Sequence, residues 1–199
     1  MLALSGLLAS GGDPAREPLQ PPAGIVQRMA GVSCFTGAVA ALWGQEAALS
    51  GPKAEGSHQD MDFAILDVLV TSHENAISRY SYTGDVHKRE GNRLRMAYPW
   101  TLLPCKDGHV GIIGLPRQWD VLCLWMERED LINDPLFATP HARSENADAL
   151  DAEMTAWTMR HTKEDLFREC QARHLPVGAV YTEAECLENR HLTGRGFFV

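Results

Sequence analysis

The stretch that decides how the second half of the chain folds is YPWTLLPCKDGHVGII, residues 98–113. Its two arms, Tyr98–Leu103 and His109–Ile113, are rich in the aromatic and β-branched residues that favour strands. Between them lies Lys106-Asp107-Gly108, whose Asp-Gly pair provides the backbone freedom that a tight turn requires. The stretch therefore predicts an antiparallel β-hairpin.

Helices are expected on the C-terminal side of this hairpin. Residues 118–126 carry apolar side chains at helical spacing, and residues 150–157 repeat the pattern. Large side chains at such spacing are typical of a core. The side chains that we expect to be buried are Trp119, Leu122, Cys123, Met126, Leu150, Met154 and Trp157.

Two helix starts and a third strand complete the second half of the chain. Thr162–Asp165 has the form of a capping box, with Asp where Glu or Gln is usual, and Thr182–Glu185 matches the box itself. Pro176–Tyr181 is typical of a strand. Residues 98–199 are therefore predicted to form a small α+β domain.

The N-terminal side has a different composition. Residues 12–24 hold four prolines and two glycines and predict a loop. In Ile25–Leu49 only Arg28 and Glu46 are charged, which predicts a helix buried on most sides. In Asp60–Ile65 apolar residues alternate, which predicts a short strand leading into a helix over 66–78. Residues 1–82 are therefore expected to be an α/β segment.

Between the two halves lies the polar segment 83–97. It carries five basic side chains if His87 is counted. We expect an exposed loop that links the two domains. The predicted fold class is α/β, with part of a large domain at 1–82, this linker, and the small α+β domain at 98–199.

Bulk properties exclude several functions. The net charge of −8 disfavours binding to a nucleic acid backbone, and we see no uninterrupted apolar run of membrane-spanning length. Five dispersed cysteines indicate reduced thiols in a cytoplasmic protein. The eight histidines form no metal-binding motif, and no glycine-rich nucleotide loop occurs. We therefore expect neither a metal site nor a nicotinamide cofactor.

Many stretches resemble, in shared order and spacing, the motifs of family III CoA-transferases, the CaiB/BaiF family. That family includes formyl-CoA transferases, L-carnitine CoA-transferases and alpha-methylacyl-CoA racemases. The resemblance covers almost the whole chain. The matching stretches are Leu4–Leu8, Gly12–Pro14, Pro21–Gly24, Ala30–Leu42, Gln59–Ala64, Arg89–Asn92, Tyr98–Val110, Gln118–Trp119, Asn133–Phe137, Arg143, Leu175–Gly178 and His191–Gly196.

The resemblance implies a Rossmann-like large domain, a smaller α+β domain and an interlocked homodimer. It also implies that this chain is a fragment, which lacks the opening Rossmann half and a closing segment. The implied activity is transfer of CoA between an acyl-CoA and a carboxylic acid. No covalently bound cofactor is implied, because CoA is itself the substrate.

The resemblance also implies where catalysis takes place. In the family, an Asp four residues before a Gly carries the acyl group and then CoA; here that Gly is Gly31 and the residue is Gln27. An amide is a weak nucleophile and forms no anhydride, although it can donate hydrogen bonds to a thioester oxygen. Asp13 and Glu46 are other acidic candidates, with Asp13 more simply a turn initiator and Glu46 a solvated side chain.

The segment 88–96 matches the family's active-site loop, which implies contacts with CoA. The candidate residues are Arg89, Gly91, Asn92, Arg93 and Arg95. Guanidinium groups bind phosphates and carboxylates well, but a solvated basic loop has the same composition. Two other functions stay open: a non-catalytic paralogue that serves as a dimerisation partner, and an acyl-CoA racemase or isomerase. The acyl donor and acceptor are not predictable from this sequence.

Overall fold

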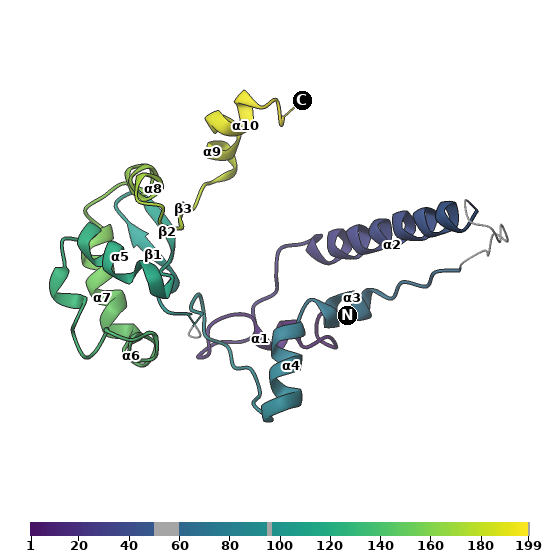
Figure 1. Ribbon diagram of the computed structural model, residues 1–199, viewed down its shortest axis with the longest axis horizontal. Coiled ribbons are helices and arrows are strands. Elements are labelled where there is room, and N and C mark those ends of the chain that lie inside the picture. Colours follow the sequence, from purple (N-terminus) through teal and green to yellow (C-terminus); the bar gives the residue numbers. More distant parts are fainter. Residues whose placement is uncertain (50–59, 95–96, 199) are drawn as a thin grey trace. The chain divides into compact units, whose positions relative to one another are not determined.

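The computed structural model describes residues 1–49, 60–94 and 97–198. They form two compact units, Met1–Gly91 and Asn92–Val199, each described separately below (Figure 1). The boundary between the units falls within the polar segment 83–97.

The second unit is built on the predicted hairpin. Strands β1 (Trp100–Cys105) and β2 (Gly108–Ile113) pair antiparallel, with Leu103 opposite Val110. Strand β3 (Val177–Ala179) pairs antiparallel with the other edge of β2, so the sheet order is β1-β2-β3. The hairpin and the third strand are confirmed, with each boundary shifted by up to two residues.

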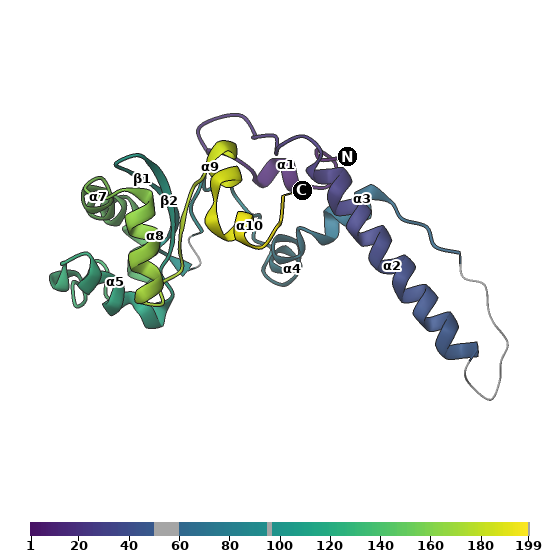
Figure 2. The ribbon, with the colours of Figure 1, turned by 90° about the horizontal axis from the view of Figure 1, so that it is seen from above.

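Helices cover one face of this sheet. They are α5 (Trp119–Trp125), α6 (Pro140–Glu145), α7 (Ala147–Thr158) and α8 (Lys163–Ala172), with short 3-10 turns η2 at Pro116–Gln118 and η3 at Glu129–Leu131. Figure 2 shows α5, α7 and α8 on the same side of the strands. The inward-facing strand residues pack with the predicted helix residues into one core. Its members include Leu103, Val110, Ile112, Trp119, Leu122, Cys123, Met126, Leu150, Met154 and Trp157.

Both predicted caps are present. Thr162 Oγ1 accepts a hydrogen bond from the Asp165 amide at 3.2 Å at the start of α8. Thr182 forms a complete capping box with Glu185 at the start of α9 (Glu183–Glu188), which is followed by α10 (Arg190–Gly194). The cap side chains satisfy amides that have no partner within the helix, so both helices begin where the sequence predicts.

The first unit is helical. It contains α1 (Leu7–Ser10), α2 (Ile25–Leu49), α3 (Ile65–Thr71) and α4 (Glu74–Thr83). The predicted helix α2 is confirmed over its whole length. Its stretch Ile25–Ala47 is long and apolar enough to cross a membrane by length and composition, a test that core helices of soluble proteins also pass.

Two predictions for the first unit are wrong. Helix α2 is not buried on most sides, because Val32, Phe35 and Trp43 are each at least two-thirds exposed. Helix formation depends on local sequence, whereas burial requires a partner. In the described residues, α3 and the segment before it provide that partner on one side. There the Phe63 ring lies directly over Gly37 and leaves no room for a Cβ.

The second error concerns residues 60–64, which form no strand, and the helix after them, which is divided at Ser72–His73. A strand is stable only when a neighbouring strand supplies hydrogen bonds, and the described part of this unit contains none. The chain is therefore a mixed helix-and-sheet protein, and a Rossmann-like layer in residues 1–82 stays a prediction.

Candidate functional site

Gln27 lies in the first turn of α2, with its side chain exposed to solvent. The exposed Glu46 lies near the other end of the same helix. The Asp13 carboxylate accepts a hydrogen bond from the amide of Ala15 at 2.7 Å, which is the local turn that Asp-Pro predicts. Gln27 is thus accessible to a ligand, while Asp13 has a structural function.

Arg89 holds a neighbouring loop in place. Its guanidinium donates hydrogen bonds to three backbone carbonyls, those of Ala9 at 3.4 Å, Asp13 at 3.3 Å and Arg16 at 3.1 Å. The amide of Gly91, a residue with φ of 65°, donates to the carbonyl of Gly12 at 3.2 Å. Both residues thus brace the loop that precedes α2.

Arg93 belongs to the second unit and is bound to two carboxylates there. Its Nη1 lies 2.6 Å from Asp148 Oδ1, and its Nε donates to Asp151 Oδ2 at 2.8 Å. The other Asp151 oxygen accepts a hydrogen bond from the buried Tyr98 hydroxyl. These contacts show a structural function for Arg93 in this conformation; Arg95 lies outside the described residues.

The charge state of this cluster follows from burial and pairing. Burial opposes the charge on Arg93, but hydrogen bonds to Asp148 and Asp151 outweigh it and raise the pKa of the guanidinium. Burial, together with the Asp151 carboxylate, also raises the pKa of Tyr98. Tyr98 is therefore a neutral donor and Arg93 a permanent cation.

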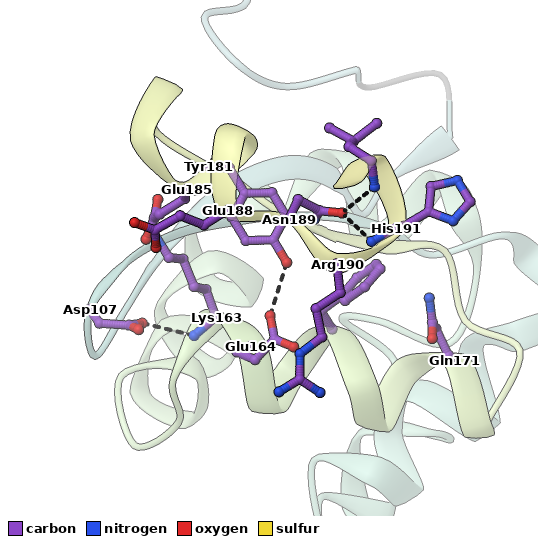
Figure 3. A pocket seen from close by; sticks show the side chains of 12 residues that line it. Asp107, Lys163, Glu164, Gln171, Tyr181, Glu185, Glu188, Asn189, Arg190 and His191 are labelled. Atoms are coloured by element: carbon purple, nitrogen blue, oxygen red, sulfur yellow. Dashed lines mark hydrogen bonds and ion pairs between the residues drawn. The ribbon is translucent and has the colours of Figure 1, made fainter. Parts of the chain in front are cut away.

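A cavity of about 950 Å³ lies between α8 and the α9–α10 segment (Figure 3). Lys163 Nζ forms an ion pair with Glu185 at 2.5 Å, and the Lys163 amide donates to Asp107 at 2.8 Å. The Tyr181 hydroxyl donates to Glu164 at 2.9 Å. Contacts with Lys163 and Thr182 lower the pKa of Glu185 to about 2. The ion pair between Lys163 and Glu185 thus attaches α9 to α8.

This cavity has little capacity for an anionic ligand. Four carboxylates line it, those of Asp107, Glu164, Glu185 and Glu188. Within the described part of the chain, Arg190 also lines the cavity, and its guanidinium has no hydrogen-bond or ion-pair partner there (Figure 3). Because the acidic residues outnumber the basic ones, we assign this cavity a structural function.

A second hollow lies on the sheet face opposite the helices. It has a volume of about 430 Å³, and Asn92, Trp100 and Leu102 contribute to its lining. Asn92 is the one predicted contact residue that lines this hollow. The sequence signal for it was available: glycines inside strands, here Gly111 and Gly178, often mark a place where a ligand or another backbone approaches.

A pair of histidines lies in the first unit. His73 and His87 line a cavity of about 270 Å³, with ring centroids 6.3 Å apart. Burial, and then the neighbouring His87, lower the pKa of His73 below its ordinary value of 6.5. The His73 ring is therefore packed best in its neutral form.

Acid should weaken the first unit through His73. A lowered folded-state pKa means that the unfolded chain binds the proton first, so stability is complete above pH 6.5 and is lost as pH falls toward the lowered value. His73→Gln should reduce this pH dependence, as measured by hydrogen exchange of α4 between pH 7 and 5. The exposed-site control His141→Gln should retain it; an unchanged profile in His73→Gln contradicts the assignment.

In the described ranges, no group of three or more His, Cys, Asp or Glu side chains is arranged to hold a metal ion. All five cysteines are free, and Cys105, Cys123 and Cys170 are buried. The exposed Gln27 amide and the apolar hollow at Asn92 are thus candidates for ligand chemistry among the described residues.

Solved structures identify the class of protein to which this fold belongs. A CaiB/BaiF family protein from Brucella suis matches with a TM-score of 0.79 and 25% identity, over 100% of this chain and 51% of its own. A structure from Mycobacterium tuberculosis has the same fold, with a TM-score of 0.77 and 21% identity over 97% of this chain and 49% of its own.

The sequence comparisons specify the family. The family model "CoA-transferase family III" matches residues 1–199, and the chain belongs to this family. It is 30% identical over 195 residues to a succinyl-CoA–D-citramalate CoA-transferase from Chloroflexus aurantiacus, covering 97% of this chain and 47% of that protein. A succinyl-CoA:mesaconate CoA-transferase from Haloarcula marismortui is 27% identical, over 97% of this chain and 46% of its own length. The chain thus spans about half the length of these relatives.

Proposed function

We propose that this chain contributes to a CoA-transferase that moves CoA between an acyl-CoA and a carboxylic acid. The observation that carries the proposal is the match of the family model to every residue from 1 to 199. The relatives named above use succinyl-CoA as donor and small organic acids as acceptors. A cytoplasmic homodimer with a Rossmann-like large domain forms part of the proposal.

The reaction needs a nucleophile that accepts two groups in turn. A carboxylate attacks the thioester carbonyl, forming a mixed anhydride and releasing CoA thiolate. The thiolate then attacks the side-chain carbonyl, which releases the first acid and leaves an enzyme-bound thioester. Gln27 occupies the position that the resemblance assigns to this residue, and its exposure leaves it accessible.

An amide at this position favours a second candidate function. Gln27 can donate a hydrogen bond to a thioester oxygen, but its carbonyl oxygen is too weak a nucleophile for the anhydride step. The chain would then be a catalytically impaired paralogue that serves as a dimerisation partner. A racemase or isomerase of the same family is a third candidate, and deuterium incorporation at the α-carbon of an acyl-CoA would reveal it.

Replacing Gln27 by Asp tests the proposal. In the protein that carries this chain, Gln27→Asp should introduce CoA transfer from succinyl-CoA to a carboxylic acid, or raise its rate by at least about 10²-fold. The reason is that the variant adds a nucleophile to a site that already binds the substrates, and the two contributions to the rate multiply. Mass spectrometry should detect CoA bound to residue 27. Gln45→Asp adds the same charge to α2 at another position and should give no transfer.

The outcomes separate the candidates. Transfer by the unmodified protein that survives Gln27→Ala would show that another residue is the nucleophile. CoA binding without transfer in either form, together with a stable dimer, would support the paralogue. Absence of CoA binding in calorimetry, for the unmodified protein and for Gln27→Asp, would refute the enzymatic function.

A further inference from the structure

The sheet of the second unit has one uncovered face. Side chains alternate along β1, so that Thr101, Leu103 and Cys105 face the helices while Trp100 and Leu102 face away. Trp100 is 41% exposed and Leu102 is 44% exposed. Within the described part of the second unit, no helix covers the large apolar side chains of this outer face.

Two glycines lie side by side on neighbouring strands of that face. Leu102 on β1 is opposite Gly111 on β2, which in turn is opposite Gly178 on β3. The Leu102 side chain lies over Gly111, 3.3 Å from the place that a Cβ there would occupy, whereas a Cβ on Gly178 would meet nothing within 4 Å. The two glycines therefore form the floor of a trough, which is open above Gly178.

The lining of the trough defines what it can bind. Its volume is about 430 Å³, within the usual range for small-molecule sites. Its lining on the outer face includes Asn92, Trp100, Leu102, Gly111, Ile113 and Gly178. Among these described residues none is charged, and Asn92 supplies an amide. Such a site suits a hydrocarbon group that is attached to one polar function.

We propose that this trough holds the hydrocarbon part of an acyl thioester, so that the chain favours aliphatic or aromatic acyl groups over those with a second carboxylate. The inference rests on the proposed function for the presence of a thioester. Asn92, which lines the trough, is one of the residues that the resemblance places in contact with CoA. A free carboxylate on the acyl group would lose its hydration here and find no cation among the described lining residues.

Geometry favours a small molecule over an added strand as the occupant. Strand addition requires the free hydrogen-bonding groups at a sheet edge. The floor of the trough is instead the face of the sheet, where the β2 backbone already pairs with β1 and β3. The remaining protein occupant is the surface of a second polypeptide, which the experiment below distinguishes.

Gly178→Leu fills the trough at its open end. No left-handed φ is required at Gly178, and the new Cβ has free space, so the fold should persist. The first probe is the thioester of octanoic acid with N-acetylcysteamine, which carries an acyl chain but no nucleotide. It should shift the amide resonances of Gly111 and Gly178 in the unmodified chain, and Gly178→Leu should weaken its binding at least about tenfold, because exclusion of two methylenes already has this effect.

A matched control adds the same side chain elsewhere on the same face. His109 is exposed on β2 and does not line the trough, so His109→Leu should leave binding of the probe unchanged. Equal unfolding midpoints of the two variants show that neither disturbs the fold. Absence of probe binding to the unmodified chain, or equal binding in Gly178→Leu, overturns the trough assignment.

CoA probes separate this inference from the function on which it rests. Octanoyl-CoA should bind more tightly than free CoA and than succinyl-CoA, and Gly178→Leu should remove the advantage of octanoyl-CoA. Probe binding in the trough with no binding of any CoA compound would refute the proposed function alone. Light scattering could instead show that the unmodified protein is a dimer and the Gly178→Leu variant a monomer, with unchanged binding of the probe. That result would assign the trough to a second polypeptide and overturn the inference.

Discussion

Asp151→Ala should lower the free energy of unfolding of the second unit by about 3 kcal/mol or more, whereas Asp148→Ala should change it by less than about 0.5 kcal/mol. Both carboxylates bind Arg93, but the side chain of Asp151 is 17% exposed and that of Asp148 is 91% exposed. Removing Asp151 also leaves the buried Tyr98 hydroxyl without its acceptor. The two substitutions therefore compare a buried partner with an exposed partner of one cation.

Chemical denaturation followed by tryptophan fluorescence provides the measurement, because the described core of this unit contains Trp119, Trp125 and Trp157. Asp151→Asn distinguishes charge from hydrogen bonding, since an amide can still accept from Tyr98 but cannot pair with Arg93. Equal losses in Asp148→Ala and Asp151→Ala would contradict the importance of burial.

Arg143→Met should destabilise the same unit by about 3 kcal/mol. Arg143 is 1% exposed, and no carboxylate among the described residues forms an ion pair with it. Its guanidinium donates hydrogen bonds to the carbonyls of Tyr98 at 3.0 Å and Phe137 at 2.7 Å. The guanidinium also lies 4.4 Å from the centre of the Trp119 ring. Burial lowers its pKa. Methionine keeps much of the volume but leaves two buried acceptors without a donor, which is costly.

Urea-induced unfolding of Arg143→Met and Arg143→Lys measures the effect. Lysine should rescue little, because a single ammonium does not reproduce the planar fork that reaches both carbonyls. The control is Arg168→Met, since the Arg168 side chain is 66% exposed and pairs with Glu164 and Asp165 at the surface. A loss in Arg168→Met as large as that in Arg143→Met would contradict this explanation.

Arg143 and Asp151 both contact Tyr98. Arg143 binds the carbonyl of Tyr98, and Asp151 binds its hydroxyl. Tyr98 lies just before β1, directly after the end of the polar segment 83–97. Its fixed position therefore determines where the chain begins the sheet, and with it the location of Trp100 at the trough.

Local patterns were sufficient to predict much of the second unit. The Asp-Gly turn and its flanking strands, the spacing of Leu150, Met154 and Trp157, and the two Thr caps each act within a few residues. All of them appear in the structure near the expected positions. The resemblance to family III CoA-transferases also followed from the order of short motifs, and the family match confirms it.

The functional residues were less predictable. Arg89 and Arg93 have the composition of a phosphate-binding loop, but in the structure one binds backbone carbonyls and the other two carboxylates. A sequence shows which cations are present and not which acceptors fold against them. That Gln27 replaces a catalytic carboxylate stays a prediction for the same reason. The local sequence around Gln27 does not specify which residues would face a ligand bound there.

By itself the sequence determined the long helix α2, several helices of the second unit, the hairpin and the family of this protein. The reason is that turn residues, caps and hydrophobic periodicity operate over short distances along the chain. Only the tertiary structure decided that α2 exposes its large apolar side chains, that residues 60–64 form no strand, and that Gly111 and Gly178 meet in one trough. Burial and cross-strand pairing depend on residues far apart in sequence, so no local pattern specifies them.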